Sequence, residues 1–266
     1  MGYDHMTELL LNTPIPIDSK DKNERTALHW AAVGGHVEVV KLLIDRKAGL
    51  ELKDVDDSTP LILAILNDHE AVFKLLVETE QLSLDELDSY GRTPLFLAAT
   101  HGYEHFVTQL ISRGCQIAVT DFYSSTLLHV AVRSGLESLV CILLGSETFE
   151  LDSEDCLGRT PRWWSRRCGH SAIETLLVDH AISQGIELRD SGEVPRISTA
   201  DASLKSRPWC DVCTLVIDYD GRYCGCPEGC FQGRLAICSD CYELGARCMD
   251  SSHEVDWKVA PRPTES

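Results

Sequence analysis

A threonine recurs along the first two-thirds of this 266-residue chain at steps of 33, 34, 33 and 34 residues. Each of these threonines follows an aspartate by five residues and precedes a glycine or an aspartate by nine residues. An apolar pair stands 17 and 18 positions after each of them. The five threonines are Thr26, Thr59, Thr93, Thr126 and Thr160. Because several features share one period, we expect an array of similar stacked units rather than a chain folded around one central core.

Each unit is predicted to contain a turn followed by two short helices. The threonine can cap the first helix, in which Leu28 and Ala31 lie on one face, and Gly35 can end that helix in a left-handed conformation. The aspartate can accept hydrogen bonds from backbone amides in the turn. The second helix carries an apolar stripe that includes Val39 and Leu43. One unit cannot bury this stripe alone, so neighbouring units must stack.

The segments RTALHWAAVGGH, RTPLFLAATHGY and STLLHVAVRSGL resemble ankyrin repeats, a family with this period and a T-P-L-H-x-A core. The resemblance covers residues 1–182 and implies a helical solenoid that binds protein partners. It predicts half a repeat followed by about five repeats, since Gly2 lies 33 residues before Gly35. The chain is therefore expected either to begin with a lone capping helix or to be the tail of a longer polypeptide.

The fifth unit departs from the pattern at two positions of its first helix. Arg162 stands where the other units have leucine, and Ser165 replaces a small alanine. A charged side chain is rarely tolerated in a core unless it is paired, so Arg162 is expected to mark the solvent-facing cap at the end of the array. The cysteines of the array are expected to be buried apolar thiols. They are Cys115, Cys141, Cys156 and Cys168.

The charge and hydropathy of the chain restrict its partners and its location. With 24 Lys+Arg against 42 Asp+Glu, the net charge is −18, which argues against nucleic acid as a partner. No run approaches the roughly 20 apolar residues that span a bilayer, and the N-terminal segment is too short and too acidic for a signal peptide. We therefore expect an intracellular protein, cytoplasmic or nuclear, with no membrane partner.

Eight of the twelve cysteines lie between residues 210 and 248, after a polar segment that is predicted to be a linker. Two Cys-x2-Cys pairs indicate zinc, and eight ligands would hold two ions. Nine residues compete for these eight places, which leaves one of Cys224 and Cys226 spare. The nine are Cys210, Cys213, Cys224, Cys226, Cys230, Cys238, Cys241, Cys248 and His253. Asp220-Gly221, between two strand-like runs, predicts a β-hairpin.

The pattern WCDVC…RYCGC…C…ICSDCYELGARC…H resembles a ZZ-type zinc finger, as found after ankyrin arrays in large proteins of filamentous fungi. The resemblance implies two structural Zn2+ ions with crossed ligands, although spacing alone is equally compatible with a sequential arrangement. One ion would be held by Cys210, Cys213, Cys238 and Cys241, and the other by Cys226, Cys230, Cys248 and His253.

The predicted fold class is therefore mainly α, with a small second module. An ankyrin-repeat α-solenoid (1–182) is followed by a linker (183–208), a two-zinc ZZ-like module with a β-hairpin (209–258) and a disordered tail (259–266). Family members that bind a free N-terminal amine use acidic residues. Asp211 matches the first of these positions, whereas Arg234 and Ala236 occupy two others.

No catalytic motif accompanies these modules. His36-Val37-Glu38 fits half of a zinc-deaminase signature, but no Pro-Cys-x-x-Cys follows it. The chain is predicted to be a non-enzymatic scaffold without a small-molecule substrate, in which the array binds one protein and the zinc module binds a second protein or a basic peptide. Candidate partner-binding residues are Tyr90, Phe122, Tyr123 and Asp211; the three aromatic residues could instead pack between neighbouring turns. A RING-like ubiquitin ligase and a histone-tail reader are the alternatives.

Overall fold

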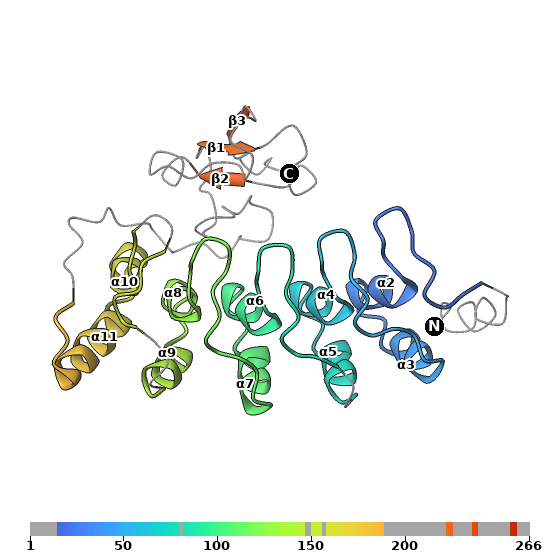
Figure 1. Ribbon diagram of the computed structural model, residues 1–266, viewed down its shortest axis with the longest axis horizontal. Coiled ribbons are helices and arrows are strands. Elements are labelled where there is room, and N and C mark those ends of the chain that lie inside the picture. Colours follow the sequence, from blue (N-terminus) through green and yellow to red (C-terminus); the bar gives the residue numbers. More distant parts are fainter. Residues whose placement is uncertain are drawn as a thin grey trace, which may run out of the picture.

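The computed structural model describes residues 15–79, 82–146, 150–155 and 158–188, and the backbone of three short strands between residues 222 and 259. Over the described residues between 15 and 188, helices follow one another as five pairs. The pairs are α2 (Ala27–Val33) with α3 (Val37–Asp45), α4 (Pro60–Leu66) with α5 (Glu70–Val77), α6 (Pro94–Thr100) with α7 (Glu104–Ser112), α8 (Leu127–Arg133) with α9 (Glu137–Leu144), and α10 (Pro161–Cys168) with α11 (Ser171–Gln184). Figure 1 shows the pairs side by side in chain order. The stack that the period predicts is confirmed.

The recurring threonines begin the first helix of each pair. Four of their hydroxyl groups accept a hydrogen bond from the backbone N–H three residues ahead, and this satisfies an amide that has no partner within the helix. The four bonds join Thr59 to Ile62 (3.4 Å), Thr93 to Phe96 (3.2 Å), Thr126 to His129 (3.3 Å) and Thr160 to Trp163 (3.2 Å). The predicted capping is confirmed at these positions.

A left-handed residue ends each of these helices nine positions after the threonine. The φ angle there is +66° at Gly35, and it remains positive at the equivalent residue of every later unit. Asp68, with φ of 57°, shows that one unit adopts this turn without glycine. The turn reverses the chain sharply, so the second helix packs back against the first.

The core is continuous from one helix pair to the next. The five leucines at position 17 after the threonines are each at most 1 % exposed: Leu43, Leu76, Leu110, Leu143 and Leu177. Between the second and third pairs, the rings of Phe73 and Phe106 meet with their centroids 4.7 Å apart. First helices contact first helices along the row, from α2 and α4 through to α8 and α10. Each unit therefore depends on its neighbours for burial.

The last helix pair contains the departures predicted for an end of the array. Arg162 is half-buried, and its Nε lies 3.6 Å from Oε1 of Glu174 on α11. Ser165 is buried and its hydroxyl donates to the carbonyl oxygen of Arg162 at 2.8 Å. Helix α11 runs two residues past the expected boundary at 182, because the chain first reaches a left-handed glycine at Gly185.

The expectation for the cysteines of the array is wrong at one position. Cys115 and Cys168 are buried, and burial raises the pKa of each thiol to about 11. Cys141 is exposed, since the buried face of α9 is formed by Leu139, Val140 and Leu143. Cys156 lies outside the described residues.

Three strands of the cysteine-rich region form an antiparallel sheet in the order β2-β1-β3. They are β1 (Arg222–Gly225), β2 (Ala236–Cys238) and β3 (Asp256–Val259). Strand β1 begins directly after the predicted Asp220-Gly221 turn, but its two edges pair with β2 and β3. A strand has only two edges, and both edges of β1 are occupied by β2 and β3, so the observed pairing differs from the predicted hairpin. The residues before the turn, which were expected to form the other strand of that hairpin, lie outside the described residues.

Candidate protein-interaction surface

The turns before the first helices are built around the recurring aspartates, and we call them fingers 1 to 5. They comprise residues 20–25, 53–58, 87–92, 120–125 and 154–159, of which 156 and 157 are not described. In finger 2, Oδ1 of Asp54 accepts from the backbone N–H groups of Asp56 and Ser58, both at 3.0 Å. Asp88 and Asp121 make the same two bonds in fingers 3 and 4. The role predicted for these aspartates is confirmed.

Backbone hydrogen bonds join neighbouring fingers into one row. The three bonds run from Val55 N–H to the Asn23 carbonyl (3.2 Å), from Ser89 N–H to the Asp56 carbonyl (3.1 Å) and from Phe122 N–H to the Tyr90 carbonyl (2.9 Å). Lysines add further links, because Lys20 Nζ donates to the carbonyl of Lys53 and Lys53 Nζ donates to that of Leu87. Relative motion of the fingers would break these bonds, so the row is held together as a unit.

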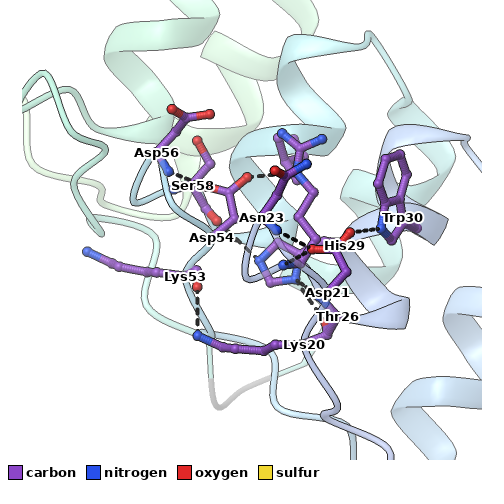
Figure 2. A network of polar contacts seen from close by, with 12 residues as sticks. Lys20, Asp21, Asn23, Thr26, His29, Trp30, Lys53, Asp54, Asp56 and Ser58 are labelled. Carbon is purple, nitrogen blue, oxygen red and sulfur yellow. Dashed lines mark hydrogen bonds and ion pairs between the residues drawn. The ribbon is translucent and has the colours of Figure 1, made fainter. Parts of the chain in front are cut away.

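Fingers 1 and 2 also share a network of polar side chains (Figure 2). Arg25 Nε lies 2.9 Å from Oδ2 of the buried Asp54 carboxylate, which pairs finger 1 with finger 2. His29 of α2 reaches in the same direction, since its Nε2 lies 3.2 Å from the carbonyl oxygen of Ser58. Trp30 Nε1 donates to Asp21 Oδ2 at 3.0 Å. Helix α2 thus contacts its own finger through Trp30 and the finger of the next unit through His29.

His129 makes the equivalent link between α8 and finger 5. Its Nδ1 accepts from the backbone N–H of Thr126 at 3.1 Å, so the proton of the neutral ring is on Nε2. Nε2 therefore donates to the carbonyl of Arg159 at 3.0 Å. Burial lowers the pKa of His129 to about 4 and also lowers that of His29. Both histidines serve the fold in their neutral form, and neither is placed for acid–base catalysis at neutral pH.

We expect acid to weaken the array through His129. A histidine in the unfolded chain titrates near 6.5 and the folded one near 4, so between these values the unfolded state binds more protons and stability falls as the pH is lowered. Asp121 opposes this effect, because burial raises its pKa to about 6 and the folded form takes up a proton below that value. In urea titrations from pH 7 to pH 4, His129→Gln should flatten the pH dependence and Asp121→Asn should steepen it.

Glutamine is the appropriate replacement because its amide can accept from Thr126 and donate to Arg159 without titrating. The two variants should therefore differ in opposite directions from the wild type. Equal slopes for the wild type and His129→Gln would show that the proton of His129 has no part in acid unfolding.

The aromatic residues predicted to bind partners are placed differently from one another. Phe122 in finger 4 is 61 % exposed. Tyr90 and Tyr123 are half-buried: the Arg92 guanidinium carbon lies 4.4 Å from the centroid of the Tyr90 ring, and Tyr123 packs against the core. Of the three, Phe122 offers the largest accessible fraction. Asp211 lies outside the described residues.

Two further apolar residues on neighbouring fingers are exposed, and the sequence pattern did not predict them as partner-binding residues. Val55 of finger 2 is 39 % exposed and Leu87 of finger 3 is 45 % exposed. Aliphatic residues in a repeat are ordinarily assigned to its core, and only their position before the capping threonine could have indicated otherwise. Together with Phe122 they place one exposed apolar side chain on each of fingers 2, 3 and 4. We call Val55, Leu87 and Phe122 the finger row.

Residues 1–82 and 46–121 match the family described as Ankyrin repeats (3 copies). This chain carries ankyrin repeats. Ankyrin repeats bind protein partners and are typically non-enzymatic modules. In the structure two further helix pairs follow the matched residues, and the last of them ends at Gln184.

Parts of this chain are similar to segments of two proteins whose names indicate unrelated activities. The palmitoyltransferase AKR1 of Lachancea kluyveri is 36 % identical over 89 residues, which cover 32 % of this chain and 12 % of that protein. The potassium channel AKT2/3 of Arabidopsis thaliana is 43 % identical over 54 residues, which cover 20 % of this chain and 7 % of the channel. The palmitoyltransferase match covers only the ankyrin repeats, so this similarity carries no evidence for transferase activity here.

The predicted zinc ligands lie outside the part of the chain whose side chains the structure describes. Within the described part, no group of three or more His, Cys, Asp or Glu side chains is arranged to hold a metal ion. The longest helix there, α11, has 14 residues, and no described helix is long and apolar enough to cross a bilayer.

Proposed function

We propose that this chain is a non-enzymatic interaction scaffold that works inside the cell, with the ankyrin stack binding a protein partner along the finger row. The observation that carries the proposal is the exposure of Phe122 on a row of fingers joined by backbone hydrogen bonds. Large aromatic side chains dominate the energetics of protein interfaces, and a surface already held in its bound form loses little conformational entropy on binding.

Replacing Phe122 by alanine should weaken partner binding at least about tenfold, the effect usual for a central interface residue. Full-length wild type and Phe122→Ala would be immobilised separately and exposed to a lysate of the source cells. Proteins retained by each would be compared by quantitative mass spectrometry. Because the Phe122 side chain is mostly exposed, circular dichroism should show the same helical content in both proteins.

Ile142→Ala is the matched control, since Ile142 is 46 % exposed on α9 and is not part of a finger. The partner should bind this variant as it binds the wild type. If every protein retained by the wild type is retained equally by Phe122→Ala, the finger row is not the binding surface.

We further propose that the cysteine-rich module is a second binding unit, folded around two zinc ions. Seven thiolates and one imidazole form a donor set that suits tetrahedral zinc, and the ligands would be those named from the ZZ resemblance. The metal would supply folding energy rather than reaction chemistry. Two modules in tandem would raise the effective concentration for a partner that carries both binding sites.

A further inference from the structure

We infer that the finger row binds an extended, basic segment of a partner protein, whose apolar side chains contact Val55, Leu87 and Phe122. This inference rests on the proposed scaffold function and specifies the chemistry of the partner. It follows from three properties of fingers 2 to 4: the exposed apolar residue on each finger, the support of the Phe122 ring and the charge around the row.

Hydrogen bonds between fingers 2, 3 and 4 bring their three exposed apolar residues onto adjacent fingers. Val55 and Phe122 each occupy the second position of a four-residue turn, which is closed by Asp57 N–H to the Asp54 carbonyl and by Ser124 N–H to the Asp121 carbonyl, both at 3.0 Å. Both side chains are exposed, Val55 to 39 % and Phe122 to 61 %. Finger 3 lies between these two fingers and is bonded to both. The second position of its turn is Ser89, and its exposed apolar residue is Leu87, which comes just before Asp88. A segment that crosses the three fingers in turn would meet one apolar side chain on each.

Phe122 is held in place by the neighbouring finger. A Cβ atom added to Gly91 would lie 2.9 Å from Cδ1 and Cε1 of the Phe122 ring, so the ring rests on finger 3 where a side chain would otherwise stand. Gly91 also has φ of +75°, a conformation that favours glycine. One face of the ring is thus supported while 61 % of the residue stays accessible. Such support limits the rotamer entropy that binding would remove.

The charge around the finger row is strongly negative. Residues 51–57 and 85–92 contain seven carboxylates and two cationic side chains. Asp54 and Asp88 are buried and make hydrogen bonds inside their fingers. The other five carboxylates are at least partly exposed: Glu51, Asp56, Asp57, Asp85 and Glu86. Finger 1, by contrast, carries three cations and two carboxylates within residues 20–25. The two cations are paired, Lys53 with Glu86 at 3.1 Å and Arg92 with Asp88 at 2.7 Å, so the excess of negative charge lies on finger 2 and on the residues just before fingers 2 and 3. A Lys/Arg-rich segment would be attracted there in particular.

The experiment selects peptides on the full-length chain from a phage-displayed library of random 12-residue sequences. We expect the retained peptides to combine Lys or Arg with aromatic or aliphatic residues. A synthetic copy of the best one should bind Phe122→Ala at least about tenfold more weakly than wild type. The double variant Asp57→Asn/Glu86→Gln should bind it about three- to tenfold more weakly at low salt and similarly to wild type at high salt, because salt screens exposed charges. Ile142→Ala should bind it within about twofold of the wild type.

Three results would overturn the inference. Retained peptides without an excess of basic residues would remove the charge argument, and peptides insensitive to Phe122→Ala would place the binding elsewhere on the chain. Retention of no peptide at all would show that the row does not bind extended segments. None of these results decides the scaffold function itself, because partner capture on wild type and Phe122→Ala measures that separately.

Discussion

Replacement of Phe106 by alanine should lower the free energy of unfolding by about 3–5 kcal/mol, the usual cost of emptying a buried phenylalanine site. Phe106 lies on α7, is completely buried and faces Phe73 of α5, with ring centroids 4.7 Å apart. It also contacts Tyr103 at the start of α7, with centroids 5.8 Å apart. The residue therefore joins the second ankyrin helix pair to the third. Urea denaturation followed by the helical circular dichroism signal would measure the loss.

The position of the substituted core residue should determine which helices lose protection from hydrogen exchange. Stacked repeats contact only their neighbours, so a cavity between the second and third pairs weakens the one interface that couples the helix pairs before it to those after it. Trp164 is also buried but belongs to the last pair, and Trp164→Ala should loosen mainly α10 and α11. Hydrogen exchange would distinguish the two variants, with protection lost around α4 to α7 in Phe106→Ala and in the last pair alone in Trp164→Ala.

Ile142→Ala provides the control for these core variants, because an exposed isoleucine should cost less than about 0.5 kcal/mol. A loss below about 1 kcal/mol in Phe106→Ala would contradict the packing of α5 against α7. An equal loss of protection in every helix of both core variants would contradict nearest-neighbour stacking.

Much of the ankyrin stack could be predicted because its signals are local. The threonine cap, the aspartate that accepts from the two amides ahead of it, and the left-handed residue after the first helix all depend on atoms within a few residues of one another. A local arrangement of this kind leaves a residue type at a fixed offset, and repetition makes the offset visible. The order of stacking then follows from short connections between units.

Contacts between units could not be predicted in the same way. Trp164 lies beside two arginines, with the guanidinium carbon of Arg159 4.5 Å and that of Arg133 5.2 Å from its ring centroid. Arg133 comes from the preceding helix pair, so its spacing from Trp164 carries no periodic signal. The packing of the Phe122 ring against Gly91 likewise joins two fingers, through residues that are 31 positions apart in the chain.

The finger row shows why exposure is harder to predict than burial. An apolar residue in a repeat fits the core pattern by default, and its sequence offset alone does not show which side of a turn it occupies. Cys141 departs from its predicted burial for a related reason, since it shares α9 with three buried residues but stands on the outer side of that helix. In both cases the deciding information is the direction of the Cα–Cβ bond relative to the next unit.

Removal of zinc should unfold the cysteine-rich module and leave the ankyrin helices intact. This follows from the proposed zinc sites, because a module with few large aliphatic residues gains most of its folding energy from its metal. The helix pairs have a continuous core of their own, formed by buried residues from Leu28 to Ala181. Native mass spectrometry should find two zinc ions per chain. After treatment with a chelator, hydrogen exchange should become fast in residues 209–258 while the helical circular dichroism signal persists.

Single cysteine variants would then separate ligands from other thiols. Cys241→Ser should release one zinc ion, whereas Cys141→Ser, in an exposed thiol of α9, should retain both. Cys224→Ser and Cys226→Ser form the informative pair, because only one of these residues is needed to complete eight ligands. Loss of an ion in Cys226→Ser alone would agree with the ligand set carried over from the ZZ resemblance, and loss in Cys224→Ser alone would exchange the two. If chelation melts the ankyrin helices as well, the stack and the cysteine-rich region are one cooperative unit and the two-module description is wrong.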